Sequence, residues 1–315
     1  MSQFNRRGFM RTLLVTAVGA VPAHATIAGK VAWPFLESGL SPSTSDLEHG
    51  SQQLRFSPTG SPFAFQNFLR INNEWKPATL PNNPFIAGDS FPLISSQVKR
   101  EDSRVQFSGE GKAEGQDGKS VAYTWDSEIS AVKPAADFPW FRFRTTLHLP
   151  APVRLHQDAR VEPQIITWLS SSSTLMEGQS GSWRRVLLEQ PTRNSLGTYG
   201  NDLPALYLLD QTVGVETMMF FDFSDMNWMS IENIPRFLSY RCSSVSHIER
   251  DGTQRLGVGL LAQQATGNVL PAGDISFTYW LLQRPMTRLL TAQESVAAAL
   301  FAGRSTTHGT ARRFR

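Results

Sequence analysis

The stretch WFRFRTTLHLP, residues 140–150, decides the class of fold. Its residues alternate strictly, so that Arg142 and Arg144 fall on one side and Phe141 and Phe143 on the other. Successive side chains of a β-strand point to opposite faces of a sheet, and a period of two over several residues therefore indicates a half-buried strand. This stretch predicts such a strand.

Similar patterns lie on both sides of this stretch. Residues 104–111 and 120–132 flank EGQDGKS, whose Asp-Gly pair is typical of a hairpin turn. A second hairpin is expected between residues 237–250 and 254–264, and a last strand over residues 275–283. Ten or more strands at this spacing predict an all-β fold, a large antiparallel β-sandwich.

One short helix is expected near the C-terminus. Thr291-Ala-Gln-Glu294 is a capping box, and Gly303 stands where such a helix would end. The chain is therefore expected to divide into a signal peptide (1–25), an irregular lead-in rich in Ser, Pro and Gly (26–62), the β-sandwich (63–290), a linker-type helix (291–303) and a disordered basic tail (304–315).

The N-terminus reads as an export signal. RRGFMR (6–11) is followed by a short apolar run (12–21) and by Ala23 and Ala25, which is the order of a secretory signal. The apolar run is about half the ~20 residues that span a bilayer, so no permanent membrane span is expected. The Arg-Arg-x-Phe-x-Arg arrangement resembles the twin-arginine signal, an address that a receptor reads. A bacterial protein of the periplasm or the medium is expected, exported by the twin-arginine machinery; an ordinary secretory signal is the alternative.

The charge distribution excludes a nucleic-acid-binding protein, and the cysteine content excludes a fold held by an intramolecular disulfide. The formal net charge is +3, but residues 1–25 hold three Arg and residues 304–315 hold four Arg, with no acid in either, which leaves −4 for the body. The body thus lacks the basic surface that nucleic-acid binding needs. Cys242 is the only cysteine, so no intramolecular disulfide can form, and its alternation with Leu238 and Tyr240 predicts a small buried side chain on a strand.

The densest aromatic and acidic stretch is ETMMFFDFSDMNWMS, residues 216–230. Thr217 and Met219 alternate with Met218 and Phe220, so both faces are mostly apolar. A strand with two apolar faces is typically buried on both sides. We expect a buried strand here that ends at Asp222.

The loop after this strand holds the candidate site. Asp225, Asn227 and Trp228 form a plausible sugar-binding platform, because aromatic rings stack on the apolar faces of sugars. Asp222, Asp225 and Glu232 are the candidate catalytic carboxylates, since glycoside hydrolysis needs two facing each other. The alternative is structural: Trp228 plugs the end of the sandwich and the acids cap backbone amides.

Metal and cofactor motifs are lacking in the sequence. No histidines or cysteines stand at metal-ligand spacing, and there is no phosphate-cradling Gly loop, so neither metal nor cofactor is expected. His148 and His247 fall in strand patterns and are expected to be sheet histidines with structural partners.

Residues 63–302 resemble a known domain in their layout. MMFFDFSDMNWMSIENIPRFLSY, the ISFTYWLLQRP strand and TRLLTAQESVAAAL are similar to the β-sandwich that precedes the (α/α)-barrel of exported six-hairpin glycosidases. That sandwich is shared with galactose mutarotases and some polysaccharide lyases. The resemblance implies a carbohydrate-associated protein, either glycan-binding by itself or the non-catalytic front part of a larger glycosidase shortened by a frameshift.

An enzyme with its site on the sandwich is the other hypothesis. A glycoside hydrolase would use the carboxylates named above, and a polysaccharide lyase would need a base near an Arg that binds uronate. Arg142, Arg144, His148 and Tyr240 could supply the lyase groups.

Overall fold

The structure is a computed structural model that describes residues 39–81, 92–135, 138–154, 164–167, 173–179, 182–186, 195–199, 205–210, 214–222, 237–242, 254–259 and 269–285. These residues form nineteen strands in four sheets and no helix, and every strand pair is antiparallel. The predicted all-β antiparallel sandwich is therefore confirmed. The predicted helix at 291–303 lies outside the described residues.

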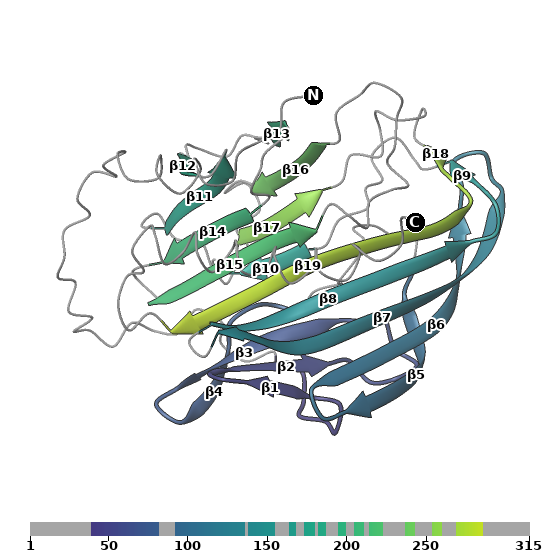
Figure 1. Ribbon diagram of the computed structural model, residues 1–315. Helices are drawn as coiled ribbons and strands as arrows, with labels where there is room; N and C mark the ends of the chain where they lie inside the picture. Colours follow the sequence, from purple (N-terminus) through teal and green to yellow (C-terminus); the bar gives the residue numbers. More distant parts are fainter. Residues whose placement is uncertain are drawn as a thin grey trace, which may run out of the picture.

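The largest sheet has nine strands in the order β12-β11-β14-β15-β19-β8-β7-β6-β5 and runs through the whole molecule (Figure 1). The predicted hairpin joins β6 to β7: Gly118 has a φ of 74°, and the Gly115 N–H donates to the Lys119 carbonyl at 2.8 Å. The nine strands are β5 (Ile94–Glu101), β6 (Arg104–Glu114), β7 (Ser120–Ala135), β8 (Phe138–Leu149), β11 (Ser173–Gln179), β12 (Ser182–Val186), β14 (Ala205–Asp210), β15 (Val215–Asp222) and β19 (Gly273–Pro285).

An aromatic core joins this sheet to a smaller one. The ring of Phe63 lies 4.5 Å from that of Phe107 on β6 and 5.1 Å from that of Trp125 on β7, centroid to centroid, and Phe65 lies 4.7 Å from Phe143 on β8. All five are at most 2% exposed, and burial of each such ring stabilises the fold by about 1.5–3 kcal/mol. The smaller sheet consists of β1 (Leu47–His49), β2 (Gln52–Phe56), β3 (Phe65–Ile71) and β4 (Glu74–Pro77).

Buried amides fix the position of the small sheet on β19. The Asn67 side-chain NH₂ donates to Gln283 Oε1 at 2.7 Å, and the Gln283 N–H donates to Gln52 Oε1 at 2.6 Å. Gln283 Nε2 donates in turn to Thr217 Oγ1 at 2.8 Å. Each of these residues is at most 2% exposed. A buried amide without a partner is costly, so this network favours one placement of the two sheets over others.

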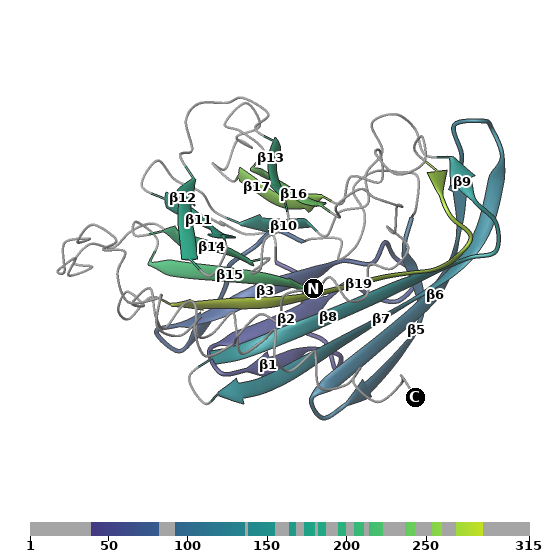
Figure 2. The same ribbon diagram turned by 45° about the horizontal axis from the view of Figure 1, so that its top comes forward.

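Short strands form the two remaining sheets. The pairing of the second predicted hairpin is confirmed, because β16 pairs with β17 and Cys242 ends β16 opposite Leu256. The predicted turn at residues 251–253 lies outside the described residues. In both views the four-stranded sheet of β10, β13, β16 and β17 lies toward the β11–β15 end of the large sheet (Figures 1 and 2). The two-stranded sheet of β9 and β18 lies at the far end, beside the β6–β7 turn. The strands are β10 (Gln164–Thr167), β13 (Ser195–Tyr199), β16 (Phe237–Cys242), β17 (Gln254–Gly259), β9 (Val153–Arg154) and β18 (Val269–Leu270).

Strand β15 confirms the prediction made from its two apolar faces. The consecutive side chains from Val215 to Met219 are all buried, although they alternate between the two faces of the sheet. The strand ends at Asp222, as expected, opposite Thr278 of β19. Both faces of the large sheet are therefore covered at this end.

The prediction of an irregular lead-in over 26–62 is wrong for β1 and β2, which lie inside this range. Leu47, Leu54 and Phe56 are at most 2% exposed, so pairing and burial in the tertiary fold override the Ser, Pro and Gly content of the local sequence. In the parts of the chain that the structure describes, no helix is long and apolar enough to cross a membrane.

Candidate functional site

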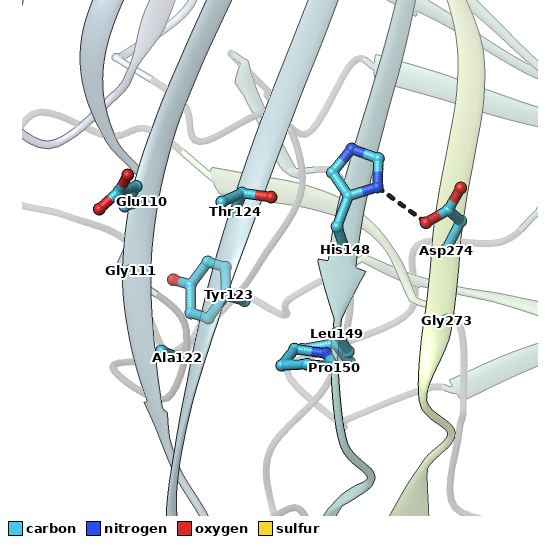
Figure 3. Close-up of a pocket in the computed structure, with 10 residues that line it drawn as sticks. All are labelled: Glu110, Gly111, Ala122, Tyr123, Thr124, His148, Leu149, Pro150, Gly273 and Asp274. Carbon is cyan, nitrogen blue, oxygen red and sulfur yellow. Dashed lines mark hydrogen bonds and ion pairs between the residues drawn. The ribbon is translucent and has the colours of Figure 1, made fainter.

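An open hollow of about 430 Å³ lies on the face of the large sheet that points away from β1–β4. It sits at the ends of β6, β7, β8 and β19, and its lining includes Glu110, Ala122, Thr124, His148, Pro150 and Asp274 (Figure 3). The hollow joins a polar row to a small apolar floor.

The register of four strands places the polar row. Glu110 of β6 lies opposite Thr124 of β7, Thr124 lies opposite His148 of β8, and His148 lies opposite Asp274 of β19. The neighbouring residues point to the other face; Trp125, for example, is buried in the aromatic core. The same alternation that builds the core thus lines up four polar side chains across four strands.

His148 is held between two carboxylates. Its Nδ1 lies 2.7 Å from Asp274 Oδ1, and its Nε2 lies 2.8 Å from Asp126 Oδ2. A neutral imidazole carries only one N–H, so it can donate to only one of these oxygens, whereas the imidazolium donates to both. The geometry therefore favours protonated His148.

The pKa of His148 reflects the same contacts. Partial burial lowers this pKa, but the hydrogen bonds and charges of Asp274 and Asp126 together outweigh it, and the pKa is raised above its ordinary value of 6.5. His148 thus keeps its proton, and with it the capacity to donate from both ring nitrogens, to a higher pH than an ordinary histidine does. The structural partners predicted for His148 as a sheet histidine are therefore present, namely Asp126 and Asp274. These two carboxylates favour the charged form of His148 in the hollow.

A second polar row adjoins the first. Asp126 lies opposite Thr146, and Thr146 lies opposite Ser276, with the two hydroxyl oxygens 3.0 Å apart. Among the described residues, no three His, Cys, Asp or Glu side chains are arranged to hold a metal ion.

Glu110 stands at the other side of the hollow. The described ion pairs in the hollow join His148 to Asp126 and to Asp274, and Glu110 takes part in neither. Its side chain is exposed and lines the hollow. Glu110 therefore presents a carboxylate to whatever enters.

A buried tyrosine supports the rim. The Tyr123 hydroxyl donates to the Pro92 carbonyl at 2.8 Å, and burial raises the pKa of this phenol, so it stays neutral. A Cβ on Gly111 would lie 2.3 Å from the Tyr123 ring, so the ring can lie across β6 only because residue 111 has no side chain. This packing fixes the backbone beside Glu110.

The basic side chains near the hollow do not line it. The Lys112 ammonium lies 3.8 Å from a Glu114 oxygen, and Arg104 Nη1 lies 3.2 Å from Glu128 Oε2. Arg144 is exposed two rows away from His148 on the same face. The lining itself therefore carries acids and His148 as its charged groups.

The site predicted from sequence falls mostly outside the described residues. Asp225, Asn227, Trp228 and Glu232 lie there. Asp222 is the last residue of β15, and its side chain is also outside the description. The sugar platform and the catalytic carboxylates proposed for this loop stay predictions.

The lyase hypothesis named four residues, and the structure brings three of them onto one strand. Arg142, Arg144 and His148 share one face of β8, whereas Tyr240 belongs to β16 in another sheet.

Sequence reasoning missed Glu110, Asp126 and Asp274. The Asp-Gly hairpin could have paired Glu110 with Thr124, and the strand patterns at 120–132 and 140–150 place Asp126 and His148 on outward faces. Asp274 could not be placed in this way, because its pairing with His148 joins strands 126 residues apart.

Comparison with known proteins gives resemblances of fold only. No protein-family model matches the chain, and no curated protein matches it. The solved structures that resemble it include galactose mutarotase-like proteins and an aldose epimerase homologue. A GalM/aldose epimerase homologue from C. elegans is 8% identical with a TM-score of 0.45, covering 77% of this chain and 98% of that one.

Two further structures are similar to the same degree. A protein from Synechocystis sp. PCC 6803 is 9% identical with a TM-score of 0.46, covering 81% of this chain and 100% of that one. A galactose mutarotase-like protein from Lactobacillus casei is 14% identical with a TM-score of 0.41, covering 76% and 99%. TM-scores below 0.5 at these identities establish neither a family nor an activity, so function has to be argued from the residues of this chain.

Proposed function

We propose that this chain is an exported, carbohydrate-associated β-sandwich protein that binds one sugar residue in the hollow around His148. The polar row over an apolar floor is the observation that carries the proposal. Sugars present hydroxyl groups that both donate and accept, together with apolar C–H faces. Glu110 and Asp274 accept, His148 donates, and Ala122 and Pro150 supply apolar surface. A few convergent polar groups on an apolar floor are typical of small-molecule sites.

The spacing of the row suits a single ring. Glu110 and His148 are separated by one intervening strand, which is two strand spacings or about 10 Å. This distance joins the backbones of the two strands, and one sugar ring held between the two side chains would lie over Thr124. Thr124, between the two, offers a hydroxyl beneath this ring.

Titration with a panel of monosaccharides, followed by protein NMR or calorimetry, tests this proposal. We expect His148→Ala to weaken binding about tenfold or more, because it removes a charged donor and releases both carboxylates. Glu74→Gln on the exposed β3–β4 hairpin is the control and should bind as the unchanged protein does. Failure of every sugar to bind, or full binding by His148→Ala, would contradict the proposal.

The loop after β15 remains a second proposed contact with sugar. Trp228 is its aromatic platform, with Asp225 and Asn227 beside it, and Asp222 and Glu232 complete the candidate carboxylates. If this loop binds sugar, tryptophan fluorescence will change on titration and the change will be lost in Trp228→Ala. A change retained in that variant would assign it to another tryptophan.

Catalysis on the sandwich is the second candidate function. Its supporting observation is that Glu110 and His148 line the same hollow on either side of Thr124, so that a carboxylate that can act as a base and an imidazole that can act as an acid belong to one site. Release of reducing ends or of unsaturated uronate from polysaccharides would show a hydrolase or a lyase. Such activity should be lost in Glu110→Gln; otherwise the hollow is not its site.

Export by the twin-arginine route is part of the proposal and is supported by the residues of the N-terminus. Replacing Arg6 and Arg7 by Lys should keep the chain in the cytoplasm of a bacterial host, because the receptor reads the arginine pair. Unchanged export of this variant would point to the ordinary secretory route. The sandwich can fill its binding role alone or as the front part of a larger glycosidase.

A further inference from the structure

We propose that Glu110 makes this hollow selective for ligand charge, so that it binds a sugar bearing a protonated amino group in preference to a neutral sugar and rejects a sugar acid. This inference rests on the proposed sugar-binding function, which it narrows to amino sugars.

The charges around the hollow are mainly negative. Glu110 and Asp274 line it, and Asp126 adjoins it through His148. Against these three carboxylates stands one cation, His148, so the group carries a net charge of about −2 even when the imidazole is protonated. Lys112, the nearest basic residue on the same face of β6, lies beside Glu114 outside the lining.

The three carboxylates do not have the same role. Asp126 and Asp274 direct an oxygen each to His148, at 2.8 Å and 2.7 Å, so much of their charge is used inside the protein. Glu110 lies across the hollow, beyond Thr124, and takes no part in that pair of contacts. A cationic group of the ligand is therefore best placed near Glu110, with ligand hydroxyls toward His148.

The size of the effect follows from the exposure of the site. Hydrogen bonds to a charged partner are stronger than neutral ones, but Glu110 is exposed and solvent screens its charge. Replacing a ligand hydroxyl by an ammonium should therefore tighten binding by about fivefold. A ligand carboxylate in the same place should weaken binding by a similar factor, since it meets like charge.

The experiment compares glucosamine, glucose and glucuronate on the full chain at about pH 6, where an alkyl amine is protonated. Affinities are measured by NMR titration in low salt and again in about 0.5 M salt, where charges are screened beyond about 4 Å. We expect glucosamine to bind most tightly and glucuronate least, with smaller differences in high salt. In Glu110→Gln the preference for glucosamine over glucose, measured as the ratio of the two affinities, should fall to about twofold or less.

One control variant and the pattern of binding results separate this inference from the proposed function. Glu74→Gln removes one exposed carboxylate far from the hollow and should keep the full preference. If glucose binds but glucosamine binds no better, or if Glu110→Gln keeps the preference, the inference is wrong while the sugar site stands. If none of the three sugars nor any other of the panel binds, the proposed function itself is wrong and the inference falls with it.

Discussion

The two faces of β6, β7 and β8 are made by alternate residues of the same three segments of sequence. On one face Phe107, Trp125 and Phe143 pack with the small sheet and are nearly inaccessible to solvent. On the other face Thr124 and His148 line an open hollow. The first face gains its stability from packed apolar area, and the second from hydrogen bonds between polar groups that water also reaches.

This difference explains how one sheet can hold a site without losing stability. Packed interiors respond to the loss of even a few atoms, whereas exposed polar groups are rehydrated when a partner is removed. The hollow is therefore free to vary in charge and hydrogen bonding as long as the inner face stays intact. Substitutions at adjacent positions should separate the two faces clearly.

The largest effect is expected from the pair Trp125→Ala and Thr124→Ala. Trp125 is 1% exposed and packs against Phe63, so its truncation leaves a cavity and should lower the free energy of unfolding by about 3–5 kcal/mol. Thr124 is exposed on the opposite face, and its truncation should change this free energy by about 0.5 kcal/mol or less. Urea denaturation of both variants provides the measurement. Similar losses in the two would show that the faces do not differ in this way.

A medium effect on stability is expected from removing a polar side chain that is buried between the two sheets. Asn67→Ala removes a donor from Gln283 Oε1 and breaks the buried network between the sheets, which should lower the free energy of unfolding by about 1–3 kcal/mol. Gln97→Ala on β5 is the matched control, because this amide is exposed and its hydrogen-bonding groups return to water. Equal stability of Asn67→Ala and the unchanged protein would mean that the network adds nothing to packing.

Local sequence was sufficient for the two-faced strands. The alternation in 140–150, the Asp-Gly turn before β7 and the apolar faces of β15 each depend on residues close in sequence, and all three predictions are confirmed. The strands β1 and β2 could not be found in this way. Their stability comes from partners in the large sheet, and weak local propensity is readily overridden by such contacts.

The candidate site, too, has residues that local sequence could place and a residue that it could not. Asp126 and His148 lie on neighbouring strands of one meander, so their outward faces could be read from sequence. Asp274 reaches His148 from a strand late in the chain, and the register of such distant strands is set by packing rather than by turns. The residues around Trp228 form a cluster within one segment and therefore give a local signal in the sequence, whereas a row of single polar residues on separate strands gives none.

The smallest effect concerns the charge of His148. The pKa of His148 should lie above 6.5, which NMR titration of its ring protons will show. In the double variant Asp126→Asn, Asp274→Asn the pKa should fall below 6.5, because the two raising partners are removed while partial burial, which lowers it, remains. Glu74→Gln should leave the titration unchanged. A His148 that titrates at or below 6.5 in the unchanged protein would contradict the arrangement described for the hollow.

Linkage converts this raised pKa into a small dependence of stability on pH. A group that binds its proton more tightly in the folded state stabilises the fold fully below its unfolded pKa, near 6.5, and this contribution is lost as pH rises through the higher folded pKa. The His148 side chain is 40% exposed, so the contribution should be under about 1 kcal/mol. Urea denaturation on both sides of this window should show the loss in the unchanged protein and not in His148→Gln. A polar face that can lose its central charge at so little cost to the fold is the kind of surface on which ligand specificity can change.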